Sequence, residues 1–271
     1  RGGPSTGMPT KTEQADLLQA LFGRNGEAPI PVIAASTPAD CFYVAFEACR
    51  IALEHMTPII LLSDAYIANG SEPWLIPSMD NLSEIKNHIV KNGNGFLPFK
   101  RNKKQLARNW ALPGSPTLEH RVGGLEKDEQ TGNVSYDPLN HQKMTDLRHQ
   151  RVDIIAESIP KVKPYGSKSG DILVLGWGST FGSIRSAVNE AIKDGQSVAH
   201  VHLNHINPFP KNLGEVLLKF RNVLIPEMNC GQLLMLIRSR FLVNARGLNK
   251  VQGKPFTVNE IYFAIKEIIG D

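Results

Sequence analysis

The first twelve residues combine the side chains and backbone types that suit binding of an anionic small molecule. Residues 1–12 contain three glycines, two prolines, three threonines and one serine beside Arg1. Glycines let backbone amides approach a ligand, and an arginine fork can bind a carboxylate through two parallel hydrogen bonds. The Thr10 hydroxyl, nine residues later, could add a donor. A glycine-rich turn that caps a following helix would have the same composition, so both interpretations stay open.

A second glycine-rich segment, GWGSTFG at Gly176–Gly182, lies between an expected strand and an expected helix. Its spacing is GxGxxxG, whereas a dinucleotide fingerprint requires GxGxxG. No acidic residue ends the following strand at His202-Leu203, where a dinucleotide site would need one. The segment therefore favours a structural strand–helix turn, with nucleotide binding as a weaker alternative.

Histidines stand in two places where they could act together. His200 and His202 would share one face of an expected strand, but no Cys, Asp or Glu stands beside them to complete a zinc site. His120-Arg121 lies within the charged segment 119–127 and suits either a ligand or partner contact or a surface ion-pair patch. We therefore expect no metal site on this chain.

Two carboxylates and two cysteines complete the set of reactive side chains. Asp64 and Glu72 follow an expected buried strand and could serve as acid or base, although helix caps and loop hydrogen bonds explain such residues more often. Cys41 and Cys49 are eight residues apart on one expected helix, which predicts core positions.

The elements that position these residues alternate between helices and strands. We expect a helix over residues 11–22, a strand over 31–35, a helix over 41–55 and a buried strand over 59–62. Apolar side chains predicted to face inward from the second helix are Phe42, Ala45, Phe46, Cys49 and Leu53. This order predicts a parallel sheet covered by helices on both faces, with ligands at the carboxyl ends of its strands.

Regular patterns weaken between residues 81 and 163 and return near residue 169. Residues 110–140 predict an ordered, irregular excursion, and loops of this length usually bind a ligand or a partner. Beyond it, strands are expected over 171–175, 197–203 and 222–225, and helices over 183–193, 231–241 and 257–269. The chain thus divides into residues 1–95, a connecting region 96–165, and a second α/β unit over 166–271.

Composition limits the classes of protein. The 271 residues correspond to about two domains, 41% are hydrophobic, and the net charge of +4 is mild. No dense Lys/Arg block suggests nucleic acid, and no apolar run approaches the ~18 residues of a membrane span. Three scattered cysteines and the lack of a signal peptide suggest a reducing, cytoplasmic protein. Because the chain opens with Arg1 inside a loop, we expect a piece of a longer polypeptide.

Eight segments, in order, resemble the alpha subunits of 2-oxoacid:ferredoxin oxidoreductases, most closely the 2-oxoglutarate branch. They are RGGPSTGMPTKTEQADL (1–17), STPADCFY (36–43), TPIILLSDAYIANGSEPW (57–74), EHRVGGLEKDEQTGNVSYDP (119–138), DILVLGWGSTFG (171–182), NPFPKNLGEVL (207–217), IPEMNCGQL (225–233) and NKVQGKPF (249–256). Together they extend over nearly the whole chain.

The resemblance implies an α/β fold: part of a thiamine-diphosphate pyrimidine-binding domain followed by a transketolase C-terminal-like domain. It implies thiamine diphosphate shared with a beta subunit that carries Mg²⁺ and a [4Fe–4S] cluster, neither of which this chain would bind. The implied reaction converts 2-oxoglutarate and coenzyme A to succinyl-CoA and carbon dioxide, with electrons passing to ferredoxin. No nucleic acid or membrane partner is implied.

Residue by residue, the resemblance implies that Arg1 holds the 2-oxoacid carboxylate and that Thr10 binds substrate. The residues that would shape the loop around cofactor and substrate are Gly2, Gly3, Ser5, Thr6 and Gly7. Many relatives have His-Gly-Glu where this chain has Asn25-Gly26-Glu27. We therefore assign no acid–base role to Asn25.

Two family elements would lie upstream: a YPITPSS-like segment and the glutamate that activates the pyrimidine ring. We therefore expect this piece alone to be inactive. Within the class, pyruvate or a branched-chain 2-oxoacid is the alternative substrate. From another class, the piece could be a non-catalytic module for contacts between subunits.

Overall fold

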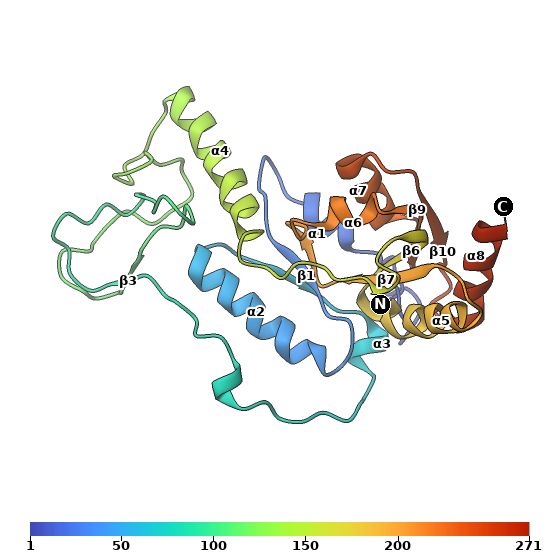
Figure 1. Ribbon diagram of the computed structural model, residues 1–271. Coiled ribbons are helices and arrows are strands. Elements are labelled where there is room, and N and C mark those ends of the chain that lie inside the picture. Colours follow the sequence, from blue (N-terminus) through green and yellow to red (C-terminus); the bar gives the residue numbers. More distant parts are fainter. Residues whose placement is uncertain (271) are drawn as a thin grey trace.

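The computed structural model describes residues 1–270 and contains three sheets and a series of helices (Figure 1). The strands are β1 (Val32–Ala34), β2 (Ile60–Leu62), β3 (Ile89–Val90), β4 (Trp110–Ala111), β5 (Tyr165–Gly166), β6 (Gly170–Trp177), β7 (Val198–Leu203), β8 (His205–Asn207), β9 (Phe220–Glu227) and β10 (Ala245–Asn249). The α-helices are α1 (Leu17–Phe22), α2 (Asp40–His55), α3 (Ala65–Ala68), α4 (Pro138–Ile155), α5 (Phe181–Lys193), α6 (Leu213–Leu217), α7 (Gln232–Phe241) and α8 (Val258–Gly270). Short 3₁₀ turns lie at Met79–Asn81 and Gly178–Thr180.

The larger sheet forms the centre of the second half of the chain. Its strand order is β10-β9-β6-β7-β5, and all neighbouring pairs are parallel except β5 with β7. Helices α5 and α8 pack against each other on one face, while α6 and α7 cover the other (Figure 1). This is the covered parallel sheet that long apolar strand runs predict.

The side chains of β6 alternate between the apolar clusters on the two faces of the large sheet. Leu173, Leu175 and Trp177 belong to the apolar cluster under α6 and α7, whereas Ile172 and Val174 belong to the cluster under α5 and α8. Successive side chains of a strand point to opposite faces, so a strand covered on both sides is apolar throughout. The same property made this strand recognisable in the sequence.

The prediction of a purely parallel sheet in the first half of the chain was wrong, because the smaller sheet is mixed. Strands β1 and β2 are parallel, in register from Val32–Ile60 to Ala34–Leu62. On its other edge β1 pairs antiparallel with β8, which follows the large sheet's β7 in the chain. The apolar cluster of α1 and β1 also continues into that of β6 and β7. The boundary near residue 165 stays a prediction, and the core is continuous across it.

Two helices of the first half differ from the prediction. The first, α1, begins at Leu17 instead of residue 11, because residues 11–16 form hydrogen bonds to distant segments. In α2 the buried positions are Val44, Arg50, Ile51, Glu54 and His55. The predicted inward face was wrong, because Phe42, Ala45, Cys49 and Leu53 are exposed and only Phe46 is half-buried. Cys41 is half-buried, so neither cysteine is a core residue, and β2 is half-buried along its length.

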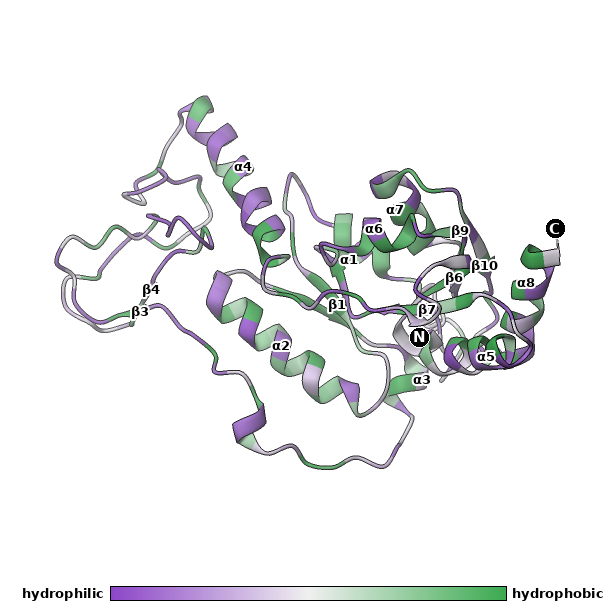
Figure 2. Ribbon diagram, viewed as in Figure 1, coloured by the Kyte–Doolittle hydropathy of each residue, from purple (hydrophilic) through white to green (hydrophobic). Residues whose placement is uncertain are grey.

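Between β2 and β5 the chain forms an extended arm that ends in α4 (Figure 1). Its irregular part agrees with the predicted excursion, but α4 was not predicted. Figure 2 shows why: this helix is largely hydrophilic, with few apolar residues and no broad apolar stripe. Its signal lies at its start, where the Asp137 side chain accepts a hydrogen bond from Leu139 N–H and Pro138 occupies the first turn.

The predicted strands and helices of the second half are confirmed within a few residues, and β6 extends to Trp177. None of the helices in residues 1–270 combines the length and apolar composition that a membrane crossing needs.

Candidate functional site

The loop at the start of the chain is closed by its own backbone. Gly2 N–H donates to Lys11 O at 2.8 Å, and Met8 N–H donates to Gly2 O at 3.1 Å. Gly7 has a φ of +53°, and a Cβ at this position would lie 1.7 Å from Gly2 O. Only glycine fits there, because any side chain would open the turn. The glycine-rich composition therefore produces a fixed, compact loop.

The two residues that the sequence singled out for substrate binding are both exposed. Arg1 Nη2 donates one hydrogen bond, to Ser5 O at 2.7 Å. A guanidinium has five N–H donors, so most of those of Arg1 remain available to a ligand. Thr10 has a φ of +54°, and within residues 1–270 its hydroxyl has no hydrogen-bond partner. Both side chains are thus placed on the loop surface with unused donors.

Asp64 connects this loop to both sheets. It follows β2, and its Oδ1 accepts from Tyr66 N–H at 3.0 Å and Ile67 N–H at 3.2 Å as the N-cap of α3. The same oxygen accepts from Thr12 Oγ1 at 3.2 Å, and Oδ2 accepts from Ser179 N–H at 3.1 Å. The capping interpretation of Asp64 is therefore confirmed. Glu72 likewise accepts hydrogen bonds from the Thr37 hydroxyl and Ala39 N–H near the start of α2.

Gln14 fastens the loop to the large sheet. Its backbone N–H and side-chain oxygen both pair with Met228, at 3.0 and 2.9 Å, and its Nε2 donates to Trp177 O at 2.8 Å. Asn229 Nδ2 donates to Gln14 O at 2.9 Å. Gln14 is nearly fully buried and cannot form hydrogen bonds to water, so these protein partners satisfy its polar atoms.

A buried carboxylate, Glu227, supports these contacts from behind. It accepts from Leu233 N–H at 2.8 Å and Leu234 N–H at 3.0 Å, at the start of α7. Trp177 Nε1 donates to it at 3.2 Å and Asn229 Nδ2 at 3.0 Å. Burial raises the pKa of the Glu227 carboxyl, against the opposing effect of these donors. Glu227 thereby joins β6, β9 and α7 where the loop attaches.

Arg1 lines a small cavity of about 40 Å³ at the carboxyl ends of two strands. The walls include Leu62 at the end of β2 with Ser63 and Asp64 after it, and Trp177 at the end of β6 with Gly178 after it. This is the edge of the sheets where the sequence predicted a ligand. Of the predicted loop residues only Arg1 lines this cavity, and Thr10 does not.

The turn Gly176–Gly182 is structural. A Cβ on Gly176 would lie 2.4 Å from Ile184 Cδ1, so this glycine permits close strand–helix packing. Ser179 N–H, which a phosphate loop would direct at its ligand, donates to Asp64 instead. His202 Nε2 donates to Gly178 O at 3.0 Å and supports the turn from below.

The paired histidines form a buried hydrogen-bond chain. Arg185 Nε donates to His200 Nδ1 at 3.2 Å, and His200 Nε2 lies 3.3 Å from His202 Nδ1. Arg185 Nε only donates, so His200 Nδ1 carries no proton and His200 Nε2 donates to His202 Nδ1. Gly178 O only accepts, so His202 carries its proton on Nε2, and both rings are neutral. Burial lowers the pKa of His200 to about 2 and that of His202 to about 3. Residues 1–270 hold no cluster of three or more His, Cys, Asp or Glu side chains placed for a metal.

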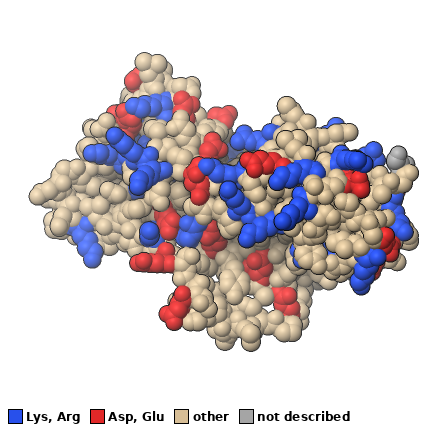
Figure 3. Space-filling view, viewed as in Figure 1, with Lys and Arg blue, Asp and Glu red and all other residues tan. Residues whose placement is uncertain are grey.

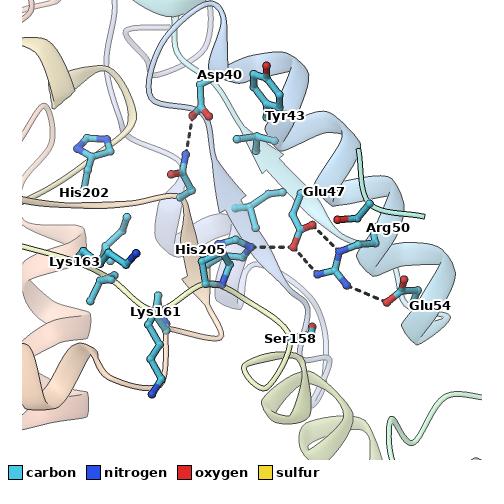
Figure 4. A pocket seen from close by; sticks show the side chains of 18 of the residues that line it. Asp40, Tyr43, Glu47, Arg50, Glu54, Ser158, Lys161, Lys163, His202 and His205 are labelled. Atoms are coloured by element: carbon cyan, nitrogen blue, oxygen red, sulfur yellow. Dashed lines mark hydrogen bonds and ion pairs between the residues drawn. The ribbon is translucent and has the colours of Figure 1, made fainter. Parts of the chain in front are cut away.

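A larger cavity of about 1080 Å³ lies between α2, residues 158–163 and residues 202–205 (Figure 4). On its α2 wall Arg50 binds Glu47 at 2.6 Å and Glu54 at 2.9 Å, and His205 lies 3.3 Å from Glu47. Burial alone would raise the pKa of Glu47, but the hydrogen bonds from Arg50 and His205 outweigh it and lower the value to about 2. The charges of Glu47, Arg50 and Glu54 are therefore paired with one another along the α2 side of the cavity.

The segment 119–127 contains more than the ion-pair patch that was one prediction. His120 Nδ1 contacts Leu118 O at 2.8 Å, and the buried Lys127 ammonium donates to the carbonyls of Gly123 and Leu125. Glu126 alone forms ion pairs, with His141 and Arg148 of α4. Most of this segment therefore serves to hold the arm together.

Sequence reasoning missed Gln14, Glu227 and Asn229. No local pattern marks Gln14, because its partners lie more than 160 residues away. Glu227 and Asn229 could have been found from their place in the sequence. They are polar residues between the apolar strand run NVLIP and the following helix.

Residues 1–137, half of the chain, match the family described as "Pyruvate flavodoxin/ferredoxin oxidoreductase, thiamine diP-bdg". This chain belongs to that family. Residues 170–261 match "Pyruvate:ferredoxin oxidoreductase core domain II". The family resemblance and the fold class predicted from the sequence are therefore confirmed, including a domain of the thiamine diphosphate-binding kind.

Individual members of the family are similar over almost the entire chain. The chain is 51% identical over 264 residues to "2-oxoglutarate oxidoreductase subunit KorA" of Mycobacterium tuberculosis, covering 96% of this chain and 40% of the relative. It is 27% identical to "2-oxoglutarate synthase subunit KorA" of Methanothermobacter marburgensis, covering 97% of this chain and 68% of that relative.

A solved structure agrees with this fold. It is the 2-oxoglutarate:ferredoxin oxidoreductase from Magnetococcus marinus with 2-oxoglutarate, coenzyme A and succinyl-CoA bound. The TM-score is 0.94 and the identity is 28%, covering 99% of this chain and 47% of that chain. The chain thus spans less than half the length of this protein and of the mycobacterial relative.

Proposed function

We propose that this chain is part of the alpha subunit of a 2-oxoglutarate:ferredoxin oxidoreductase. The complete enzyme would convert 2-oxoglutarate and coenzyme A to succinyl-CoA and carbon dioxide and pass two electrons to ferredoxin. The observation that carries the proposal is the 51% identity with a protein named for 2-oxoglutarate over 96% of this chain. The likeness to a solved structure with 2-oxoglutarate and coenzyme A bound supports the same substrates.

The loop chemistry agrees with an acidic substrate. Arg1 is exposed and uses one donor on Ser5 O, so its guanidinium can receive a carboxylate in a two-bonded fork. The Thr10 hydroxyl can donate to a second substrate oxygen. Because Gly7 and Gln14 fix the loop, these donors are held in place before the substrate arrives. We assign substrate binding to Arg1 and Thr10, and loop shape to Gly2, Gly3, Ser5, Thr6 and Gly7.

Thiamine diphosphate is too large for the cavity beside Arg1. The cavity beside Arg1, at about 40 Å³, has room for about one water molecule and not for a two-ring cofactor. In addition, residues 1–270 hold no carboxylate cluster for the Mg²⁺ that accompanies a diphosphate. We therefore propose that this chain forms one wall of the site and that a beta subunit supplies the diphosphate anchor, Mg²⁺ and a [4Fe–4S] cluster.

When bound, the cofactor supplies the electron sink that decarboxylation requires. This chain's own residues would orient the substrate: Arg1 binds the acid group, and Asp64 with Gln14 keeps the loop against the two sheets. We also infer a cytoplasmic enzyme, in keeping with three free cysteines at Cys41, Cys49 and Cys230.

A substrate panel tests this function. The full-length protein, assembled with its beta subunit, is given 2-oxoglutarate, pyruvate or a branched-chain 2-oxoacid, each with and without coenzyme A, and reduction of a viologen dye is followed. We expect rapid reduction with 2-oxoglutarate that depends on coenzyme A. A preference for pyruvate or for a branched-chain acid would move the enzyme to another branch of the family, and reduction by none of the acids would refute the proposal.

A further inference from the structure

An arginine cluster in the arm carries positive charge that the described residues neutralise only in part. Arg101 and Arg108 lie opposite each other in an antiparallel bridge, joined by a short turn in which Asn102 N–H donates to Ala107 O at 2.9 Å. Arg148 and Arg151 lie on α4, which packs beside this turn. All four side chains are at least half-buried.

The geometry of α4 and of the turn places the four arginines near enough for their charges to act on one another. Met144, Arg148 and Arg151 occupy positions i, i+4 and i+7 of α4 and therefore share one face. Arg101 Nη1 contacts Met144 Sδ at 3.5 Å, which places the turn against this same face. Arg108 stacks on the ring of Phe99 at 4.2 Å, and Arg151 Nη1 donates to Met56 O at 3.0 Å.

The partners of these groups are almost all neutral. Within residues 1–270, no carboxylate forms an ion pair with Arg101, Arg108 or Arg151. Among the described residues, the one ion pair of the cluster joins Arg148 to Glu126 at 3.8 Å, and Glu126 lies closer to His141, at 2.6 Å. The Nε atoms of Arg101 and Arg151 are buried and have no acceptor at all. Buried donors without acceptors are uncommon, and a bound ion or an ordered water can serve as the acceptor.

Electrostatics point the same way. Burial and the neighbouring arginines lower the pKa of Arg101 to about 10, although the Glu129 and Glu126 charges act in the opposite direction. Burial and the neighbouring arginines also lower the pKa of Arg151 to about 10. Such repulsion disfavours the arrangement unless an anion is held between the charges. Figure 3 shows Lys and Arg atoms on the surface over α4 and the arm, with Asp and Glu atoms among them.

We propose that Arg101, Arg108, Arg148 and Arg151 form a binding site for a phosphate group. Guanidinium forks match the paired oxygens of phosphate, and several forks around one point can serve its three or four oxygens together. The four guanidinium groups lie between the turn 101–108 and α4. This place suits a compact anion better than the broad surface of another protein. The phosphate can be free or carried by a nucleotide. The site is separate from the loop of Arg1, and the proposal does not rest on turnover of 2-oxoglutarate.

Thermal unfolding and calorimetric titration of the full-length protein test the site. Inorganic phosphate, pyrophosphate and ADP are compared with chloride at equal ionic strength. We expect phosphate to raise the Tm above that in chloride. Tighter binding of ADP than of inorganic phosphate would identify a nucleotide as the carrier, and equal or weaker binding would identify the free anion.

Matched variants separate binding from folding. R101M keeps an unbranched stem and removes the guanidinium group with its charge. R221Q removes one charge from an exposed ion pair with Asp171. We expect R101M to bind phosphate at least about tenfold more weakly while its Tm without phosphate is unchanged or higher, and R221Q to bind as the parent does. If R101M does not fold, R108K is used, which keeps the charge, loses the planar fork and should bind severalfold more weakly.

Three results would overturn the proposal. One is equal stabilisation by phosphate and chloride. Another is phosphate binding that is unchanged in the folded arginine variant. The third is stabilisation by an added protein partner but by none of the phosphate compounds, because the cluster would then be a protein interface.

Discussion

Replacing Asp64 by asparagine should weaken the attachment of the loop 1–12 to both sheets. The Asp64 carboxylate accepts four hydrogen bonds, from Thr12, Tyr66, Ile67 and Ser179. An asparagine has one accepting oxygen, so in either orientation its NH₂ group faces at least one donor. The side chain is 6% exposed, so water does not replace the lost acceptor.

The magnitude follows from this geometry. A buried donor left without an acceptor costs about 1–3 kcal/mol. We therefore expect D64N to lower the free energy of unfolding of the full-length protein by about 1–3 kcal/mol, and its Tm by several degrees. The KM for 2-oxoglutarate should also rise, because Arg1 and Asp64 line the same cavity. Unfolding is followed by calorimetry or circular dichroism, and KM by dye reduction.

E72Q is the matched control. It removes the same charge from a carboxylate close in sequence, but this carboxylate is exposed and glutamine can still accept from Thr37 and Ala39. We expect its stability to change by less than about 0.5 kcal/mol. If D64N is as stable as E72Q and has the parent KM, then Asp64 does not hold the loop and our description of the site is wrong.

Three further predictions concern the loop and the buried charges. Gly7→Ala should raise the KM for 2-oxoglutarate, because its Cβ would collide with Gly2 O, whereas Gly182→Ala, with open space around its Cβ, should leave kinetics unchanged; steady-state assays compare them. The pKa of Glu47 is about 2 in the folded protein and 4.5 ordinarily, so its ionised form stabilises the fold by about 3 kcal/mol above pH 4.5. This stabilisation is lost as the pH falls toward 2. Denaturant titrations between pH 5 and pH 2 should therefore show a smaller loss of stability in E47Q than in the parent. His200 and His202 bind protons only when unfolded below about pH 6.5, so they should weaken the fold increasingly as pH falls below that value; nitrogen NMR at pH 5.5 should show two neutral rings protonated on Nε2, and charged rings would contradict the hydrogen-bond chain.

Sequence patterns predicted the elements whose partners are nearby or whose burial is uniform. Strand β6 was predictable because both of its faces are covered, so every residue from Ile172 to Leu175 is apolar. Helix α2 was located correctly, but its buried face includes Arg50 and Glu54, which pair with each other and so can be buried despite their charge. A hydrophobic periodicity argument cannot anticipate such pairing.

Long-range pairings account for most of what was missed. Strand β8 is short and pairs with β1, about 170 residues earlier in the chain, so no local signal marks it. The anchors of the loop, Gln14 with Met228 and Asp64 with Ser179, are separated by 214 and 115 residues. The loop itself was recognisable because a glycine is needed at Gly7, where a Cβ would collide with the nearby Gly2 O. Its attachment to the sheets depends on the tertiary fold alone.

The most direct test of the central claim is the KM for 2-oxoglutarate of Arg1→Ala in the full-length protein assembled with its beta subunit. Loss of a carboxylate partner in a binding site costs about 2–5 kcal/mol, so the KM should rise at least about tenfold, with the KM for coenzyme A unchanged. Arg221→Ala, at an exposed ion pair, serves as the control and should keep the parent values. An unchanged KM and kcat in Arg1→Ala would show that the loop does not bind the substrate carboxylate.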